Sequence, residues 1–213
     1  MIGNYFSRLF CYWQMKSLAV LFLLASLGAI AQTNCTLKLN KDSIRIYTCG
    51  NESSKYKTIK VNFTLTANRS QLIAMLLDID HLGDWQYRTV SAQLLKKISD
   101  REIIYHTEVD GPVIDNRDFV INLKIDEAPT NHELTITATS LPDYIPRKEK
   151  VVRIPMSKAV WKIKEEKKGQ LAVEYVIQID FGGVIPAWVV NSLAHKAPYE
   201  TFKSMREKIG SYN

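Results

Sequence analysis

The chain has 213 residues, and its 28 basic and 22 acidic side chains give a formal net charge of +6 at pH 7. The basic residues are scattered rather than gathered in one block, which argues against a nucleic-acid-binding protein, and we expect no nucleic-acid partner. Hydrophobic residues make up 46% of the sequence, which is enough for one domain with a full core.

The first 31 residues have the pattern of a cleaved signal peptide. They carry basic residues and no acid, and a short apolar run ends in the small-residue motif Ala29-Ile30-Ala31. Met15 begins a compact version of the same leader and is an alternative start. A membrane anchor is the competing interpretation, but it needs about 20 apolar residues. The sequence therefore predicts a leader over residues 1–31, a mature domain over residues 32–213, and export to the periplasm or the exterior.

Two cysteines remain in the predicted mature domain, Cys35 and Cys49. Disulfides persist in exported proteins, and a bridge between these two would close a loop of about 15 residues and contribute on the order of 3 kcal/mol. Two free or buried thiols are the alternative, because pairing cannot be read from sequence alone. Cys35 and Cys49 are thus a disulfide candidate.

The predicted elements begin with a β-hairpin. Apolar and polar residues alternate over residues 59–65, the period of a half-buried strand, and residues 43–48 supply its partner. Asn68 or Ser70 can cap a short helix that runs to about Asp80. Further strand patterns follow with short turns and no helix between them: residues 94–98, 103–109, 118–125, 134–139, 151–154, 159–164 and 171–179. Strands joined in this way must pair antiparallel.

The segment after Pro186 is predicted to be a long amphipathic helix that covers the apolar face of this sheet. Its apolar residues recur at helical spacing along one side: Val189, Leu193, Ala197, Phe202, Met205 and Ile209. Gly182 and Gly183 precede it and can adopt the backbone angles of a sharp strand-to-helix turn. Periodicity therefore predicts the α+β class, with one long helix packed on one antiparallel sheet.

No catalytic motif is present, and we expect no catalytic residue, no metal site and no cofactor. The sequence lacks His-Glu-x-x-His, Gly-x-Ser-x-Gly, Cys-x-x-Cys and a Gly-rich phosphate loop. His106, Glu108 and Asp110 alternate on one predicted strand and are a conceivable metal set, but we interpret them as its solvent-facing side. The other histidines have no evident carboxylate partner: His81, His132 and His195.

Three motifs point to a known family: Asn116-Arg117-Asp118-Phe119-Val120, Val151-Val152-Arg153-Ile154, and the turn from Asp180 to Trp188. Together they resemble the START domain, the lipid-transfer module related to steroidogenic acute regulatory protein, over roughly residues 42–211. The family usually has Pro where this chain has Phe181. The resemblance implies the START-like helix-grip fold, in which a curved antiparallel sheet wraps around a long C-terminal helix.

The cavity of such a fold gives a set of candidate ligand contacts: Trp85, Tyr105, Thr107, Arg117, Leu123, Tyr175, Trp188, Val189, Leu193 and Phe202. Thr107 and Leu123 stand where sterol-carrying members have an acid–base pair, so we expect a more apolar interior than theirs. Arg117 and Asp118 match the family's Arg-Asp pair, and Arg153 matches its Val-Arg motif. A guanidinium inside an apolar domain must find a carboxylate or an anionic ligand group, and for Arg117 both remain open.

The resemblance implies a carrier, not an enzyme, that shields one lipid or other hydrophobic small molecule. A cavity enzyme of the cyclase or aromatase type is the alternative, because related helix-grip proteins include such enzymes, and a scaffold with a filled interior is a third. We expect a monomer that touches membranes transiently. In this hypothesis the terminal helix opens as a gate, with Trp188 near the mouth and four basic residues meeting anionic headgroups: Lys196, Lys203, Arg206 and Lys208. A permanently packed core helix is the alternative to the gate.

Overall fold

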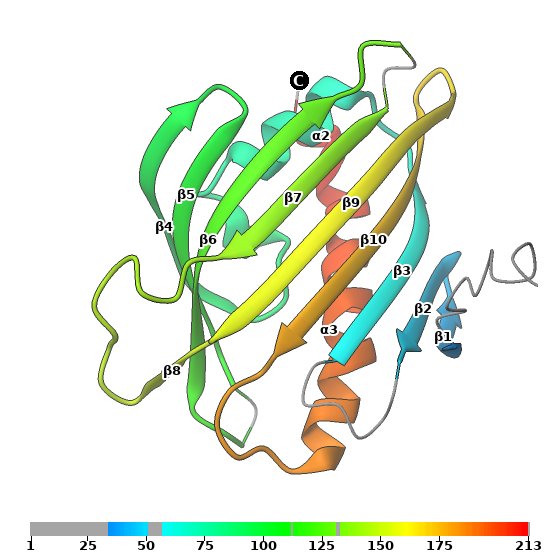
Figure 1. Cartoon of the computed structure of the whole chain (residues 1–213). Helices are drawn as coiled ribbons and strands as arrows, with labels where there is room; N and C mark the ends of the chain where they lie inside the picture. The colour runs from blue at the N-terminus through cyan, green and yellow to red at the C-terminus, as the bar shows by residue number, and fades with distance from the viewer. Residues whose placement is uncertain (1–33, 51–56, 112, 131–132, 213) are drawn as a thin grey trace, which may run out of the picture. The chain divides into compact units, whose positions relative to one another are not determined.

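The structure is a computed structural model that describes residues 34–50, 57–111, 113–130 and 133–212 (Figure 1). The predicted signal peptide, Met15 and the cleavage motif lie outside the described residues. Within the described ranges, no helix is both long enough and apolar enough to cross a membrane.

The described residues form one sheet of ten strands: β1 (Cys35–Lys41), β2 (Ile44–Cys49), β3 (Lys57–Leu65), β4 (Thr89–Ser99), β5 (Glu102–Val109), β6 (Asn116–Glu127), β7 (Leu134–Ser140), β8 (Val151–Arg153), β9 (Met156–Lys167) and β10 (Gln170–Asp180). Nine of them follow the order β1-β2-β3-β10-β9-β7-β6-β5-β4, and every neighbouring pair along this path is antiparallel. The antiparallel sheet is confirmed, and β1 is an addition to the predicted strands.

The short strand β8 corrects the expectation that all neighbouring strands pair antiparallel, because it runs parallel to the start of β6. A tight turn forces two strands to run in opposite directions, but β8 is separated from β6 by β7 and a further loop. That length of chain lets β8 return in the same direction as β6. The pairing sets Val152 opposite Arg117 and Arg153 opposite Asp118.

A short helix, α2 (Arg69–Leu77), begins at a capping box. The side chain of Asn68 accepts a hydrogen bond from the Gln71 backbone N–H, and the side chain of Gln71 accepts one from the Asn68 N–H, both at 2.9 Å. These bonds satisfy two of the N–H groups that a helix start leaves open. The predicted cap is confirmed, although α2 ends before Asp80 and a 3₁₀ turn, η2 (Leu82–Asp84), follows it.

The long terminal helix, α3 (Ala187–Lys208), lies against the concave side of the curved sheet (Figure 1) and is followed by a 3₁₀ turn, η3 (Ile209–Ser211). Pro186 precedes the helix as its N-cap rather than its first residue. Gly182 and Gly183 both have φ of +64°, which confirms the predicted turn, since most other residues avoid that conformation. Pro198 lies inside α3 and cannot donate the usual helical hydrogen bond.

Aromatic rings fill the space where α3 meets the middle of the sheet. Phe202 stacks on Phe63 at 4.4 Å between ring centroids, and it meets Trp161 and Tyr175 edge-on at 5.4 and 5.1 Å. The predicted apolar stripe of α3 is largely buried, with Val189, Phe202, Met205 and Ile209 in the interior. The α+β class with one curved antiparallel sheet and a C-terminal helix is therefore confirmed.

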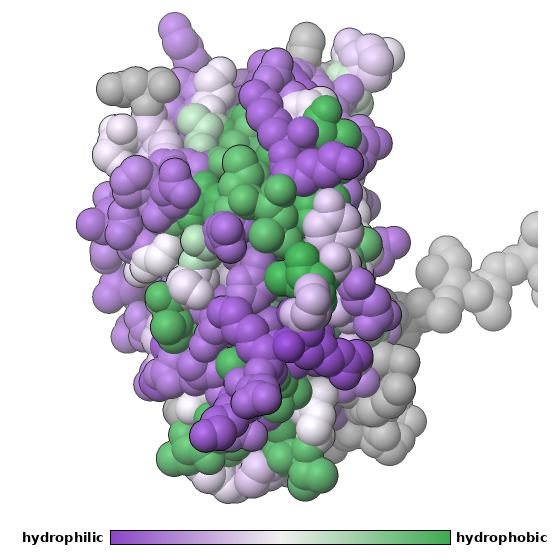
Figure 2. All heavy atoms as spheres, turned by 90° about the vertical axis from the view of Figure 1, so that its left-hand side faces the viewer, coloured by the Kyte–Doolittle hydropathy of each residue, from purple (hydrophilic) through white to green (hydrophobic). Residues whose placement is uncertain are grey.

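The two ends of the strand path differ. At one end, Cys35 lies directly opposite Cys49 in the β1–β2 register and is joined to it by a disulfide, with the Cα atoms 4.0 Å apart. At the other end, β4 has several register shifts, and hydrophilic and hydrophobic side chains mix on that side of the molecule (Figure 2). Bulges and lysines such as Lys96 and Lys97 are features that discourage an edge strand from pairing with another chain.

Candidate functional site

A cavity of about 270 Å³ lies between the sheet and α3. Strands β5, β6, β9 and β10 form one wall, and Leu193, Ala197, Pro198, Thr201 and Phe202 of α3 form the other. Most of the lining is apolar or aromatic. Its volume is just under the range of about 300 to 1,000 Å³ that is usual for small-molecule pockets, so a bulky ligand would need the wall to move.

Strand alternation decides which residues reach this cavity. Arg117, Phe119, Ile121 and Leu123 of β6 all line it, as do Tyr105, Thr107 and Val109 of β5. Successive side chains of a strand point to opposite faces, so the residues between them belong to the other side of the sheet. Arg117 and Asp118 are adjacent in sequence but serve opposite faces.

Most of the predicted ligand contacts line the cavity: Trp85, Tyr105, Thr107, Arg117, Leu123, Tyr175, Leu193 and Phe202. Trp188 and Val189, at the start of α3, are not among the lining residues. Trp188 is 65% exposed, whereas Val189 is buried in the core. Helical periodicity identified the face of α3 correctly but not how far along the helix the cavity extends.

Sequence reasoning missed the loops at one end of the cavity. Gln86, Tyr87 and Arg88 line it from the segment before β4, and Asp110 and Ile114 line it from the segment before β6. Arg88 is ion-paired with Asp110, and it adopts a positive φ of +59°. Loop residues carry no periodic signal, so only the compact fold brings these two segments together.

Two tyrosines sit in the apolar part of the lining. Burial raises the pKa of the Tyr105 hydroxyl, and burial together with the neighbouring Tyr105 raises that of Tyr175. Both hydroxyls therefore stay protonated at any physiological pH. Thr107 Oγ1 donates to the backbone carbonyl of Ser91 at 3.2 Å, which uses its proton within the protein.

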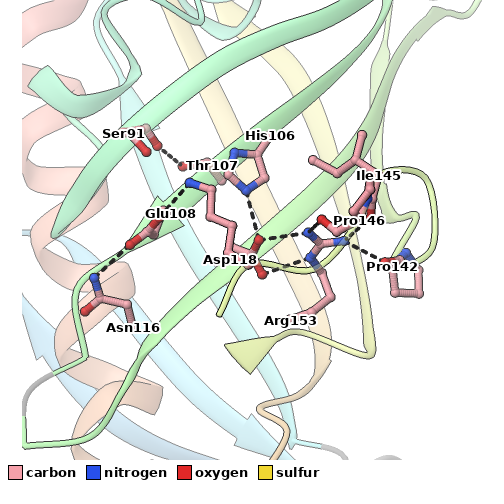
Figure 3. A network of polar contacts seen from close by, with 11 residues as sticks. Ser91, His106, Thr107, Glu108, Asn116, Asp118, Pro142, Ile145, Pro146 and Arg153 are labelled. Carbon is pink, nitrogen blue, oxygen red and sulfur yellow. Dashed lines mark hydrogen bonds and ion pairs between the residues drawn. The ribbon is translucent and has the colours of Figure 1, made fainter. Parts of the chain in front are cut away.

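A buried polar network occupies the other face of β5 and β6 (Figure 3). Arg153 binds Asp118 through two hydrogen bonds, Nε to Oδ1 at 2.8 Å and Nη2 to Oδ2 at 2.9 Å, and it also donates to the carbonyls of Pro142, Ile145 and Pro146. Burial alone would raise the pKa of Asp118, but hydrogen bonds from Arg153 and His106 outweigh it and lower that pKa. Arg153 therefore has the carboxylate partner that a buried guanidinium was predicted to need.

His106 belongs to this network, which corrects its expected place on a solvent-facing strand side. Its Nε2 lies 2.9 Å from Asp118 Oδ2, and the side chain is buried. The segment between β7 and β8 lies over this face, since Arg153 binds its carbonyl groups. The sequence pattern showed the alternation of β5 but not the loop that covers one side of it.

The three residues considered as a metal set have other partners. Glu108 accepts hydrogen bonds from Asn116 Nδ2 and Lys148 Nζ, both at 2.9 Å, and these bonds lower its pKa. Asp110 is paired with Arg88, and His106 with Asp118. In the part of the chain that the structure describes, no cluster of three potential metal ligands is found.

A second correction concerns His81, which has a carboxylate partner after all. Its Nδ1 lies 2.8 Å from Asp78 Oδ2 on the exposed surface, and hydrogen bonding to Asp78 raises the pKa of His81. His195 is half-buried on α3, and His132 lies outside the described residues.

Arg117 is the buried cation that the fold leaves without a carboxylate. It is 6% exposed, and its Nη1 donates to the backbone carbonyl of Asp115. Its Nε has no hydrogen-bond partner, and no ion pair joins it to a described residue. Burial lowers its pKa, while the exposed Asp115 carboxylate exerts a weaker opposite effect. Arg117 therefore presents a desolvated positive charge to the cavity that it lines.

Known proteins of one family resemble this chain in sequence and in fold. The model of the START domain family matches residues 36–213. The uncharacterized protein PA1579 of Pseudomonas aeruginosa is 25% identical over 80% of this chain and 84% of its own length. A crystal structure of the STAR-related lipid transfer protein of Xanthomonas axonopodis superposes with a TM-score of 0.75 at 25% identity, covering 83% of this chain and 98% of that one. The lipid transfer and protein localization domain of human StarD13 gives 0.68 at 16% identity, covering 86% and 91%.

Proposed function

Because the chain belongs to the START domain family, we propose that it binds one hydrophobic molecule, a lipid or a similar small molecule, and shields it from water. The observation that supports this most directly is the apolar cavity between the sheet and α3. The aromatic rings of Trp161, Tyr175 and Phe202 form part of its wall. The faces of these rings offer a ligand apolar contact area.

Shielding is the whole mechanism of such a carrier. Each methylene group removed from water contributes about 0.8 kcal/mol, so a long acyl chain gains on the order of 10 kcal/mol before ordering costs are subtracted. That gain in free energy is lost when the acyl chain returns to water, but it is kept when the acyl chain enters a membrane. A carrier of this kind therefore exchanges its ligand with membranes rather than with solution.

The lining favours a carrier over a cavity enzyme of the cyclase or aromatase type. Among the described lining residues Asp110 is the one carboxylate, and Arg88 engages it. The raised pKa values of Tyr105 and Tyr175 keep both hydroxyls protonated, so neither is available as a general base at neutral pH. Proton transfer at neutral pH needs a group whose pKa lies near the working pH. The enzyme remains the alternative function.

The proposal places the protein outside the cytoplasm, as a periplasmic or secreted monomer that contacts membranes transiently. The leader pattern of residues 1–31 supports export. Val184 is fully exposed and Trp188 is 65% exposed at the turn that leads into α3, and such side chains insert readily at a membrane surface. Movement of α3 about Gly182 and Gly183 would open the wall formed by Leu193 and Phe202.

Native mass spectrometry of the purified protein, followed by organic extraction, tests the proposal. We expect one hydrophobic molecule per chain, either retained through purification or taken up from lipid vesicles. Protein that neither retains nor takes up such a molecule would contradict it. A ligand recovered in chemically altered form would support the enzyme instead.

A matched pair of variants on β7 tests whether the ligand occupies this cavity. Ala138 lines it, and its neighbour Thr137 belongs to the opposite face of the strand. Ala138→Phe should fill the cavity and abolish uptake, whereas Thr137→Phe adds the same ring outside it and should leave uptake unchanged. Equal uptake by both variants would place the ligand elsewhere.

A further inference from the structure

Three cavity residues carry buried N–H groups that have no hydrogen-bond partner in the described structure. They are Nε1 of Trp85, Nε of Arg88 and Nε of Arg117. All three groups are donors only, so none can be satisfied by a ligand that lacks acceptors. A buried donor without a partner costs free energy, and native proteins rarely leave several close together.

These donors belong to the same end of the cavity. Arg88 is ion-paired with Asp110, which directly follows Val109, and Val109 lies opposite Arg117 in the β5–β6 register. Trp85 lies three residues before Arg88, in the segment that leads into β4. The apolar length of the cavity, by contrast, runs along β6 toward Leu123 and along α3.

The charges at this end do not cancel. Asp110 neutralises Arg88, but Arg117 has only the backbone carbonyl of Asp115 as its partner. The Asp115 side chain is exposed, whereas the Arg117 side chain is buried. One net positive charge is thus held beside the cavity at the point where the unpartnered donors gather. Burying such a cation without an anion costs free energy, and a ligand that supplies an anion would offset this cost.

Building on the proposed carrier function, we infer that the ligand is an amphiphile with an oxyanion at one end, a carboxylate or a phosphodiester, bound by Arg117. The guanidinium offers parallel N–H donors that match the two oxygens of such a group. The apolar chain of the ligand then follows Phe119, Ile121 and Leu123 toward Phe202. Trp85 and Arg88 supply further donors to the same polar end.

The competing explanation is that Arg117 only anchors the loop that precedes β6, through the Asp115 carbonyl. A structural anchor would not distinguish an anionic ligand from a neutral one of the same shape. Oleate and oleyl alcohol share a chain and differ in the headgroup, so they separate the two roles. At pH 8 oleate is ionised, because carboxyl groups ordinarily titrate near pH 4.

Binding of both ligands to the purified protein by isothermal titration calorimetry is the test. We expect oleate to bind at least about tenfold more tightly than oleyl alcohol, as charge-assisted hydrogen bonds in a desolvated site allow. Arg117→Met should bring the two affinities to within about twofold of each other while oleyl alcohol binds as before. Arg117→Lys keeps the charge and should retain part of the preference. Arg101→Met, on the exposed β4–β5 turn, removes one charge that does not line the cavity and should change neither affinity.

Vesicle assays with dioleoylphosphatidylglycerol and with diolein identify the source of the oxyanion. Uptake of the phospholipid but not of diolein, lost in Arg117→Met, would assign a phosphodiester headgroup. Preference for oleate alone would assign a fatty acid, which suits the small volume of the cavity.

The outcomes separate this inference from the function on which it rests. Wild-type protein that binds none of these ligands overturns the carrier function and the inference together. Equal binding of oleate and oleyl alcohol by the wild type overturns the inference alone, and it needs no variant to fold. If Arg117→Met lowers the affinity for both ligands equally, or for neither, the inference is also overturned and Arg117 is a structural anchor.

Discussion

The guanidinium groups of Arg153 and Arg117 are both buried, on opposite faces of the sheet, but they differ in their partners. Arg153 binds both oxygens of Asp118 and three backbone carbonyls, so its charge is completed by the fold. Arg117 donates to one carbonyl and has no carboxylate among the described residues. They are only one register position apart, because Arg117 lies beside Asp118 and β8 pairs Asp118 with Arg153. The fold satisfies the charge of Arg153 internally, whereas the charge of Arg117 is left for the ligand group that we propose.

The largest effect should come from breaking the completed pair. Arg153→Met leaves the carboxylate of Asp118 buried with only His106 as a side-chain partner. We expect the free energy of unfolding to fall by about 3 to 5 kcal/mol, the usual cost of a buried charge without its partner. Urea denaturation followed by circular dichroism measures it.

The exposed Arg147 supplies the control for this variant, since its side chain is 67% exposed in an ion pair with Asp143. Arg147→Met should change stability by no more than about 0.5 kcal/mol. Similar losses for both variants would mean that the Asp118 network contributes nothing beyond an ordinary surface pair.

The same network should give stability a pH dependence of defined sign. The pKa of Asp118 is lowered in the folded state, so its contribution is fully present above the unfolded-state pKa of about 3.9. The contribution is lost as the pH falls below that value through the folded pKa. The stability difference between the wild type and Asp118→Asn should therefore shrink as the pH falls below about 4. A difference that instead grows on acidification would contradict the lowered pKa.

How far sequence alone could go is clear from the two arginines. The period of two in β6 and the long apolar stripe of α3 are local signals, and they predicted the sheet and the helix. The candidate cavity residues came instead from the resemblance to the START domain, and most of them line the cavity. Strand alternation also puts the adjacent Arg117 and Asp118 on opposite faces of the sheet. The glycine turn at Gly182 and Gly183 and the Asn68 cap were equally local, and both were predicted.

The polar partners of the buried charged residues could not be predicted, because these partners lie on loops or on strands that are distant in the sequence. Asp118 meets Arg153 only because β8 returns parallel to β6, and Arg88 meets Asp110 only across a loop pairing. His106 was predicted to face solvent, because the sequence of β5 does not indicate that the segment between β7 and β8 covers this face. Val189 belongs to the predicted apolar stripe of α3, and Trp188 was expected near the cavity mouth. Neither lines the cavity, which begins further along the helix.

Arg117→Met should behave unlike Arg153→Met. The substitution removes a desolvated charge together with its one bond to the Asp115 carbonyl, and these two effects oppose each other. We expect the free energy of unfolding of the ligand-free protein to change by less than about 1.5 kcal/mol in either direction. Thermal unfolding of ligand-stripped protein measures it. A loss of about 3 kcal/mol or more would place Arg117 in the same structural class as Arg153.

A small effect should also come from Lys148, whose bond to Glu108 adjoins the network without being buried. Lys148 Nζ donates to Glu108 Oε2 at 2.9 Å, yet the Lys148 side chain is 49% exposed, and Asn116 also holds Glu108. Water can replace the lysine when it is lost, so Lys148→Met should lower stability by only about 0.2 to 1 kcal/mol, and less in high salt. A loss approaching that of Arg153→Met in the same urea denaturation assay would show that the number of ionic partners, rather than their burial, sets the cost. A large loss for Arg153→Met, with small changes for Arg117→Met and Lys148→Met, would instead make burial and the presence of a partner joint requirements for a charge that the fold depends on.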